Sequence, residues 1–117
     1  MELKFYTTDS GRAPVDDFIS GLDKQVRAKI LSCLENVQKL GLNSPMVEFR
    51  QIDGKLWEIK IKTKGGGFRL FYVYLKTDLL VLLHAYKKQT QKAPTKEMEI
   101  ATKRLKEVMS NETDYTK

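Results

Sequence analysis

The chain has 117 residues, 41% of them hydrophobic and 31% charged, a composition typical of one soluble globular domain. A single cysteine, Cys33, excludes an internal disulfide and a zinc site built on cysteines. It lies in an apolar helical pattern, which indicates a core residue. A single histidine, His84, argues against a metal centre made of several histidines.

The net charge of +6 is concentrated in the second half of the chain. Residues 1–54 carry 7 basic and 8 acidic side chains, whereas residues 55–117 carry 14 basic and 7 acidic ones. This half is expected to contact a polyanion, although a solvated basic surface would give the same excess. The opening MELKFYTTDS lacks the apolar segment of a signal peptide, and LFYVYL and LLVLL are too short to span a membrane. We therefore expect a cytoplasmic protein without membrane contact.

The first half of the chain predicts a strand followed by two helices. LKFYTT, residues 3–8, has the composition of a strand, and turn residues follow it. Pro14 suits the first turn of a short helix, VDDFISGL. Apolar side chains then recur every three or four residues from Val26 to Leu40, which predicts an amphipathic helix that ends near Gly41.

The second half predicts a sheet and a last helix. The segments VEFRQI, LWEIKIK, FRLFYVYL and LLVLLHAY read as strands, and the last three predict an antiparallel meander because their turns are short. A helix begins near Thr95, and residues 110–117 resemble a flexible tail. We expect an α+β fold in a single domain over residues 1–109. It has an N-terminal strand, two helices packed on a mainly antiparallel sheet of four or five strands, and a C-terminal helix.

The stretch KIKTKGGGFR, residues 60–69, is either a phosphate-binding loop or a hairpin turn. A phosphate-binding loop needs G-x-x-x-x-G-K-[ST] before a helix, and neither the spacing nor a following helix is present. The glycines instead suit a turn between two strands, which disfavours a nucleotide-binding enzyme. Such a hairpin would gather side chains of neighbouring strands into one cationic neighbourhood: Lys60, Lys62, Arg69, His84 and Lys88.

Each of these residues also has an ordinary structural interpretation. Lys60 and Lys62 would equally form the solvated face of an edge strand. Arg69 lies in an apolar strand and needs a partner or a ligand. A histidine next to apolar residues, such as His84, is more often a hydrogen-bonded core residue than a catalyst. Glu58 is either a base or the partner of a salt bridge.

Several segments of the chain resemble one family. They are GRAPVDDFI, KLWEIKIK, GFRLFYVY, VLLHAYKKQTQKAP and KEMEIATKRL, and the last two are the most specific. Together with the order of elements they resemble the RelE/HigB toxins of bacterial type II toxin–antitoxin pairs, most closely the phage-derived HigB-like branch. The resemblance covers residues 2–108.

The resemblance implies a RelE-like fold and an endoribonuclease that cuts mRNA in the ribosomal A site and inhibits translation, without a metal or cofactor. In this chemistry the 2′-hydroxyl attacks the adjacent phosphate and the 5′-oxygen leaves. The residues expected to take part in catalysis are Arg69, His84, Lys60, Tyr86, Lys88 and Glu58. Those expected to bind RNA are Lys62, Lys64, Lys87 and Lys92. The tyrosine that RelE-type toxins carry beyond the last strand has no match in QTQKAP, so the proton transfers fall to His84, Tyr86 or Glu58, in that order.

The resemblance also implies partners. A cognate antitoxin with a helix-turn-helix DNA-binding domain would hold the toxin inactive, and the toxin would reach operator DNA only through that antitoxin. The alternative is a catalytically inactive protein of the same fold that only binds antitoxin or RNA.

Overall fold

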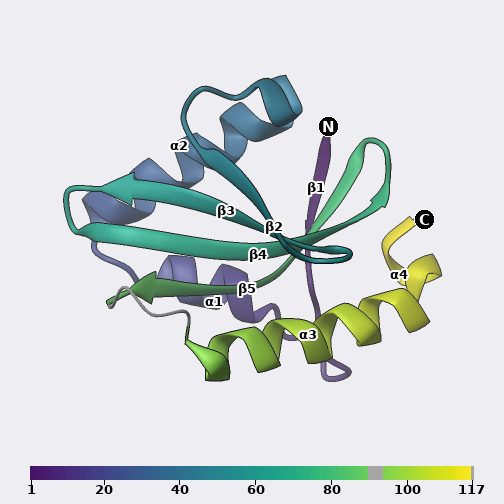
Figure 1. The fold of residues 1–117 in the computed structure, drawn as a ribbon. Helices are drawn as coiled ribbons and strands as arrows, with labels where there is room; N and C mark the ends of the chain where they lie inside the picture. The colour runs from purple at the N-terminus through teal and green to yellow at the C-terminus, as the bar shows by residue number, and fades with distance from the viewer. Residues whose placement is uncertain (90–93, 117) are drawn as a thin grey trace.

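The structure, a computed structural model, describes residues 1–89 and 94–116. Within these ranges five strands form one mixed sheet in the order β1-β5-β4-β3-β2 (Figure 1). Their bounds are Glu2–Phe5 for β1, Glu48–Asp53 for β2, Leu56–Thr63 for β3, Gly66–Lys76 for β4 and Leu79–Lys88 for β5. β1 pairs with β5 in parallel, and all other neighbours are antiparallel. The predicted α+β fold is confirmed.

Two helices cover one face of the sheet, called here the α1/α2 face. α1 is Pro14–Ser20 and α2 is Lys24–Leu40, which continues into the 3₁₀ turn η1, Gly41–Asn43. Ile30 and Cys33 of α2 are fully buried against β3 and β4 in one core cluster. Full burial of an aliphatic side chain such as that of Ile30 contributes roughly 1.5–3 kcal/mol, so this apolar stripe is what holds α2 on the sheet. The interpretation of Cys33 as a core residue is confirmed.

The opposite face, called the α3 face, carries the C-terminal helix α3, Thr95–Ser110. Ala101 and Val108 of α3 are fully buried in a second core cluster. No helix in the described residues is long and apolar enough to cross a membrane.

The C-terminal segment differs from the expected tail. Residues Glu112–Thr116 form a short helix, α4, and Tyr115 is only 6% exposed. The Lys4 ammonium donates a hydrogen bond to the Tyr115 carbonyl at 2.7 Å, and the Thr7 amide donates to the Tyr115 hydroxyl at 3.1 Å. The physical reason is that one aromatic ring gives this polar segment enough apolar area to dock beside the N-terminal strand.

Side chains along β3 alternate between the two faces of the sheet. Ile59 and Ile61 are fully buried in the α1/α2 core, so Glu58, Lys60 and Lys62 point to the α3 face. On that face burial falls along the strand: Glu58 is buried, Lys60 is partly buried and Lys62 is exposed. Helix α3 therefore leaves the end of the α3 face near the β3–β4 hairpin open to solvent.

Candidate functional site

Strand pairing lines up the predicted site residues in rows across the α3 face. Lys60 lies opposite Arg69, and Arg69 lies opposite Tyr86 on the other side. Directly opposite side chains on one face of a sheet have Cβ atoms about 4.5–5.5 Å apart. The cationic neighbourhood predicted from the hairpin is confirmed as a neighbourhood of positions.

The next row toward the hairpin tip is Lys62, Gly67 and Lys88, in that order across the sheet. The Arg69 side chain folds back toward this row, because a Cβ atom built on Gly67 would lie 3.5 Å from Arg69 Nη1. The missing side chain of Gly67 thus leaves space between two lysines for the guanidinium. We call Lys60, Lys62, Arg69, Tyr86 and Lys88 the open end of the α3 face.

Arg69 has an acidic partner at the inner edge of the open end. Its Nε atom lies 3.8 Å from Glu58 Oε1, and its Nη1 donates to the Phe68 carbonyl at 3.3 Å. The Glu58 side chain is 6% exposed and that of Arg69 is 17% exposed. One ion pair at 3.8 Å does not use the planar fork of the guanidinium, so donors of Arg69 stay available for an oxyanion. Glu58 is therefore a partner of the kind that a charged Arg69 in an apolar strand needs.

Tyr86 is the phenol of the open end. It is 7% exposed, and its ring stacks on Phe71 with ring centres 5.8 Å apart. Burial, followed by the nearby Glu58 carboxylate, raises the pKa of Tyr86 above its usual value of 10.0. The phenol is therefore protonated at neutral pH and has a proton to donate.

His84 lies one row further in, opposite Phe71, with both ring nitrogens engaged by α3. Arg104 Nη1 lies 3.3 Å from His84 Nδ1, and His84 Nε2 lies 2.6 Å from Glu97 Oε1. A guanidinium only donates, so Nδ1 accepts and Nε2 carries the proton that Glu97 accepts. Burial lowers the pKa of His84, partly offset by Glu97. This is the arrangement of a neutral histidine that ties α3 to the sheet.

The remaining predicted RNA-binding residues are spread around the hairpin tip. Lys64 is exposed in the turn of the hairpin. Lys87 lies on the α1/α2 face, where its side chain crosses Gly66, since a Cβ atom built there would meet Lys87 Cε at 2.8 Å. Lys92 lies outside the described residues.

Sequence reasoning missed Glu97 and Arg104, the residues that fix His84. Both fall on the same helical stripe as Ala101 and Val108, with spacings of four and three residues. Charged side chains on the buried stripe of a helix need partners, and that pattern was the available signal.

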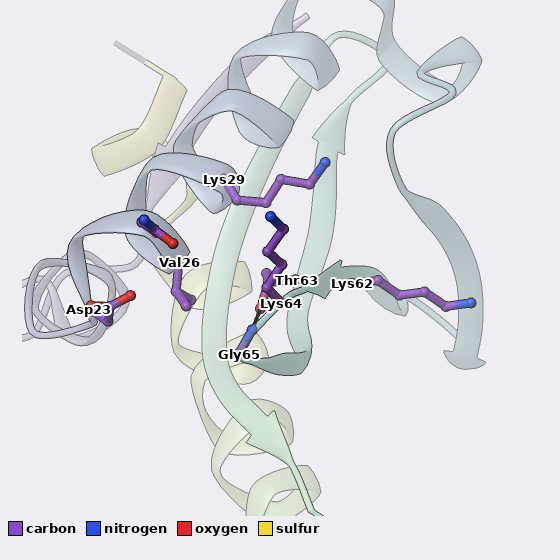
Figure 2. Close-up of a pocket in the computed structure, with 8 residues that line it drawn as sticks. Asp23, Val26, Lys29, Lys62, Thr63, Lys64 and Gly65 are labelled. Atoms are coloured by element: carbon purple, nitrogen blue, oxygen red, sulfur yellow. Dashed lines mark hydrogen bonds between the residues drawn. The ribbon is translucent and has the colours of Figure 1, made fainter.

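The α1/α2 side of the hairpin holds a pocket of about 750 Å³ that shares Lys62 with the open end. Figure 2 shows Lys29 reaching toward it from α2 and Lys64 from the hairpin. Across residues 1–89 and 94–116, no group of three or more His, Cys, Asp or Glu side chains is placed to hold a metal ion.

Comparison with known proteins places the chain in a family. No curated protein matches it significantly. Residues 17–106 match the sequence profile described as phage derived protein Gp49-like (DUF891), which spans most of the chain from α1 into α3. That family is known for RelE-like toxins of toxin–antitoxin pairs, and it implies an antitoxin partner. The chain therefore belongs to the Gp49-like family of phage-derived proteins.

Proposed function

We propose that the protein is a type II toxin that cleaves mRNA in the ribosomal A site by attack of the 2′-hydroxyl on the adjacent phosphate, without a metal ion. The observation that carries the proposal is the row Lys60–Arg69–Tyr86, which lies at the end of the sheet that α3 leaves uncovered, in a member of a toxin family. Two cations and a protonated phenol next to one another are suited to a phosphodiester whose negative charge grows in the transition state.

Arg69 and Lys60 are proposed to bind the non-bridging oxygens of the scissile phosphate. Lys62 and Lys88 flank Gly67 and would hold the neighbouring phosphates. Each such contact releases counterions, so binding to RNA should weaken steeply as salt is raised.

The proton transfers are proposed to fall to Glu58 and Tyr86. A phosphate that draws Arg69 outward would release the Glu58 carboxylate from its ion pair, and that carboxylate then accepts the proton of the 2′-hydroxyl. Tyr86 donates its proton to the leaving 5′-oxygen, which fits its raised pKa. His84 is proposed to position Tyr86 through the stack of the two rings, whose centres are 6.2 Å apart.

The antitoxin is proposed to carry a helix-turn-helix domain and to bring the toxin to operator DNA. The test expresses the chain alone in bacteria, with and without the neighbouring gene, and maps mRNA ends by primer extension. We expect growth arrest with cuts within codons, and rescue by the neighbouring gene. Normal growth with abundant folded protein would favour the inactive alternative, a module that only binds antitoxin or RNA.

A further inference from the structure

The pocket beside the β3–β4 hairpin is built by a close contact between that hairpin and the start of α2. A Cβ atom built on Gly65 would lie 2.7 Å from Val26 Cγ2, so only glycine lets the turn approach the helix this closely. The hairpin tip and the first turns of α2 lie at the same end of the molecule (Figure 1), and the pocket opens between them. Its shape therefore follows from packing and not from an accidental gap in the surface.

The charge of this pocket is mainly positive. Lys29, Lys62 and Lys64 line it together with one acid, Asp23. No salt bridge joins any of these four side chains to another residue in the described part of the chain, so the Lys29 and Lys64 ammonium groups, which extend toward the pocket, are not neutralised there. Like charges gathered in a concave site favour an anionic ligand.

Lys62 connects the pocket to the open end of the α3 face. Figure 2 shows its side chain extending away from Lys29 and Lys64, and the alternation along β3 places it on the α3 face. It pairs across the sheet with Gly67, the position that leaves room for Arg69. An extended polyanion that lies on Arg69 can therefore pass Lys62 and reach Lys64 and Lys29 without leaving basic surface.

We propose that the Lys29–Lys64 pocket is a second phosphate subsite, which binds the backbone of the same RNA strand beyond the cleaved phosphate as the strand bends around the hairpin. This rests on the proposed function. Single-stranded RNA is favoured over an acidic peptide because the pocket continues the row of cations at the open end, and backbone phosphates repeat along a strand in the same way.

The test measures binding of a short 2′-O-methyl oligoribonucleotide, which lacks the attacking hydroxyl, as a function of salt. Each phosphate contact on a single strand contributes about 0.7 to the slope of log affinity against log salt. We expect Lys29→Gln/Lys64→Gln to reduce that slope by about 0.7–1.4. The matched control Lys103→Gln/Lys106→Gln removes the same charge from exposed positions of α3 and should leave the slope unchanged. Asp23→Asn should raise the affinity, because it removes the acid of the pocket.

The outcomes separate the two proposals. Wild-type protein that binds RNA, with equal slopes for the pocket variant and its control, overturns the subsite alone. Wild-type protein that binds no RNA overturns both. A pocket variant that keeps wild-type RNA binding and loses binding to the antitoxin would assign the pocket to an acidic segment of that partner.

Discussion

The two ends of the α3 face differ in whether their charged side chains have partners within the fold. We call the end around His84, Glu97 and Arg104 the closed end. At the closed end, His84 is held by Glu97 and Arg104, and Arg104 also donates to the Leu83 carbonyl at 3.0 Å. At the open end, Lys60, Lys62 and Lys88 form no salt bridge with another described residue, although the exposed Glu48 lies opposite Lys60. The closed end satisfies its polar groups from within the fold, whereas the open end pairs Arg69 with Glu58 and leaves its three lysines to a ligand.

This difference teaches how to separate structural from functional charge. A buried polar group that already has its partners contributes to specifying the fold, and its loss is felt as lost stability. A lysine without an ion pair on the part of a sheet face that α3 leaves uncovered contributes little to stability and is available for a phosphate. Substitutions at the closed end should therefore lower the stability of the protein, whereas substitutions at the open end should lower RNA binding or cleavage.

The largest effect is expected for Arg69 at the open end. Loss of one preorganised donor to a developing oxyanion costs about 10²–10³ in rate, so Arg69→Ala should abolish growth arrest and mRNA cleavage. Arg69→Lys keeps the charge, loses the planar fork and should impair cleavage less. The measurement is primer extension after a pulse of expression, beside thermal unfolding of the same variants.

Because Glu58 is buried, Arg69→Ala also leaves a carboxylate without its ion pair. The double variant Arg69→Ala/Glu58→Gln removes that unpaired charge. We expect it to recover the stability that Arg69→Ala loses, while cleavage stays absent. A folded Arg69→Ala protein that cuts mRNA at the wild-type rate would remove Arg69 from the site.

A smaller loss is expected for the phenol of the open end. Tyr86→Phe keeps the ring stack with Phe71 and removes only the proton donor, which should lower the cleavage rate by roughly 10²-fold. The matched control is Tyr72→Phe, which makes the same change in the α1/α2 core, where Tyr72 is fully buried. Equal activity of the two variants would show that the Tyr86 hydroxyl takes no part in proton transfer.

Local patterns predicted the fold and the rows of the candidate site, because register follows from the alternation of β3 and the short hairpin. The position of Arg69 beside Lys60 could be predicted from the sequence for that reason. The partners of His84 could not be predicted in this way, since they come from α3, which is not paired with β5 through any register that the strand pattern sets. The docking of Tyr115 was missed for a similar reason: it depends on β1, at the far end of the chain, and a propensity argument over eight residues contains no such contact.

At the closed end, acid should destabilise the protein through His84. Its pKa in the folded protein lies below the usual value of 6.5, so the unfolded chain takes up a proton at higher pH than the folded one. The stability is then fully present above about pH 6.5 and falls as the pH drops toward the folded pKa.

The measurement is urea unfolding of wild type and His84→Gln at about pH 7 and about pH 5. Wild type should lose more stability on acidification than His84→Gln. At neutral pH the variant itself should be less stable by about 1–3 kcal/mol, because the partners of the ring lose their hydrogen bonds. An identical acid dependence in both proteins would show that His84 is not the group responsible.

The smallest effect is expected where α4 docks. Tyr115→Phe keeps the buried ring and removes the hydroxyl that accepts a hydrogen bond from the Thr7 amide at 3.1 Å. A typical hydrogen bond of this kind contributes about 0.5–1.5 kcal/mol, so the melting temperature should fall by only a few degrees. Tyr115→Ala also removes the ring and should lower the free energy of unfolding by roughly 3 kcal/mol or more, so it should be clearly less stable than Tyr115→Phe.

Both variants should keep the wild-type salt dependence of RNA binding, because α4 lies beside β1, at the edge of the sheet away from β3. A change in that salt dependence in Tyr115→Phe, with the protein still folded, would mean that the docking of α4 beside β1 also controls RNA binding at the open end.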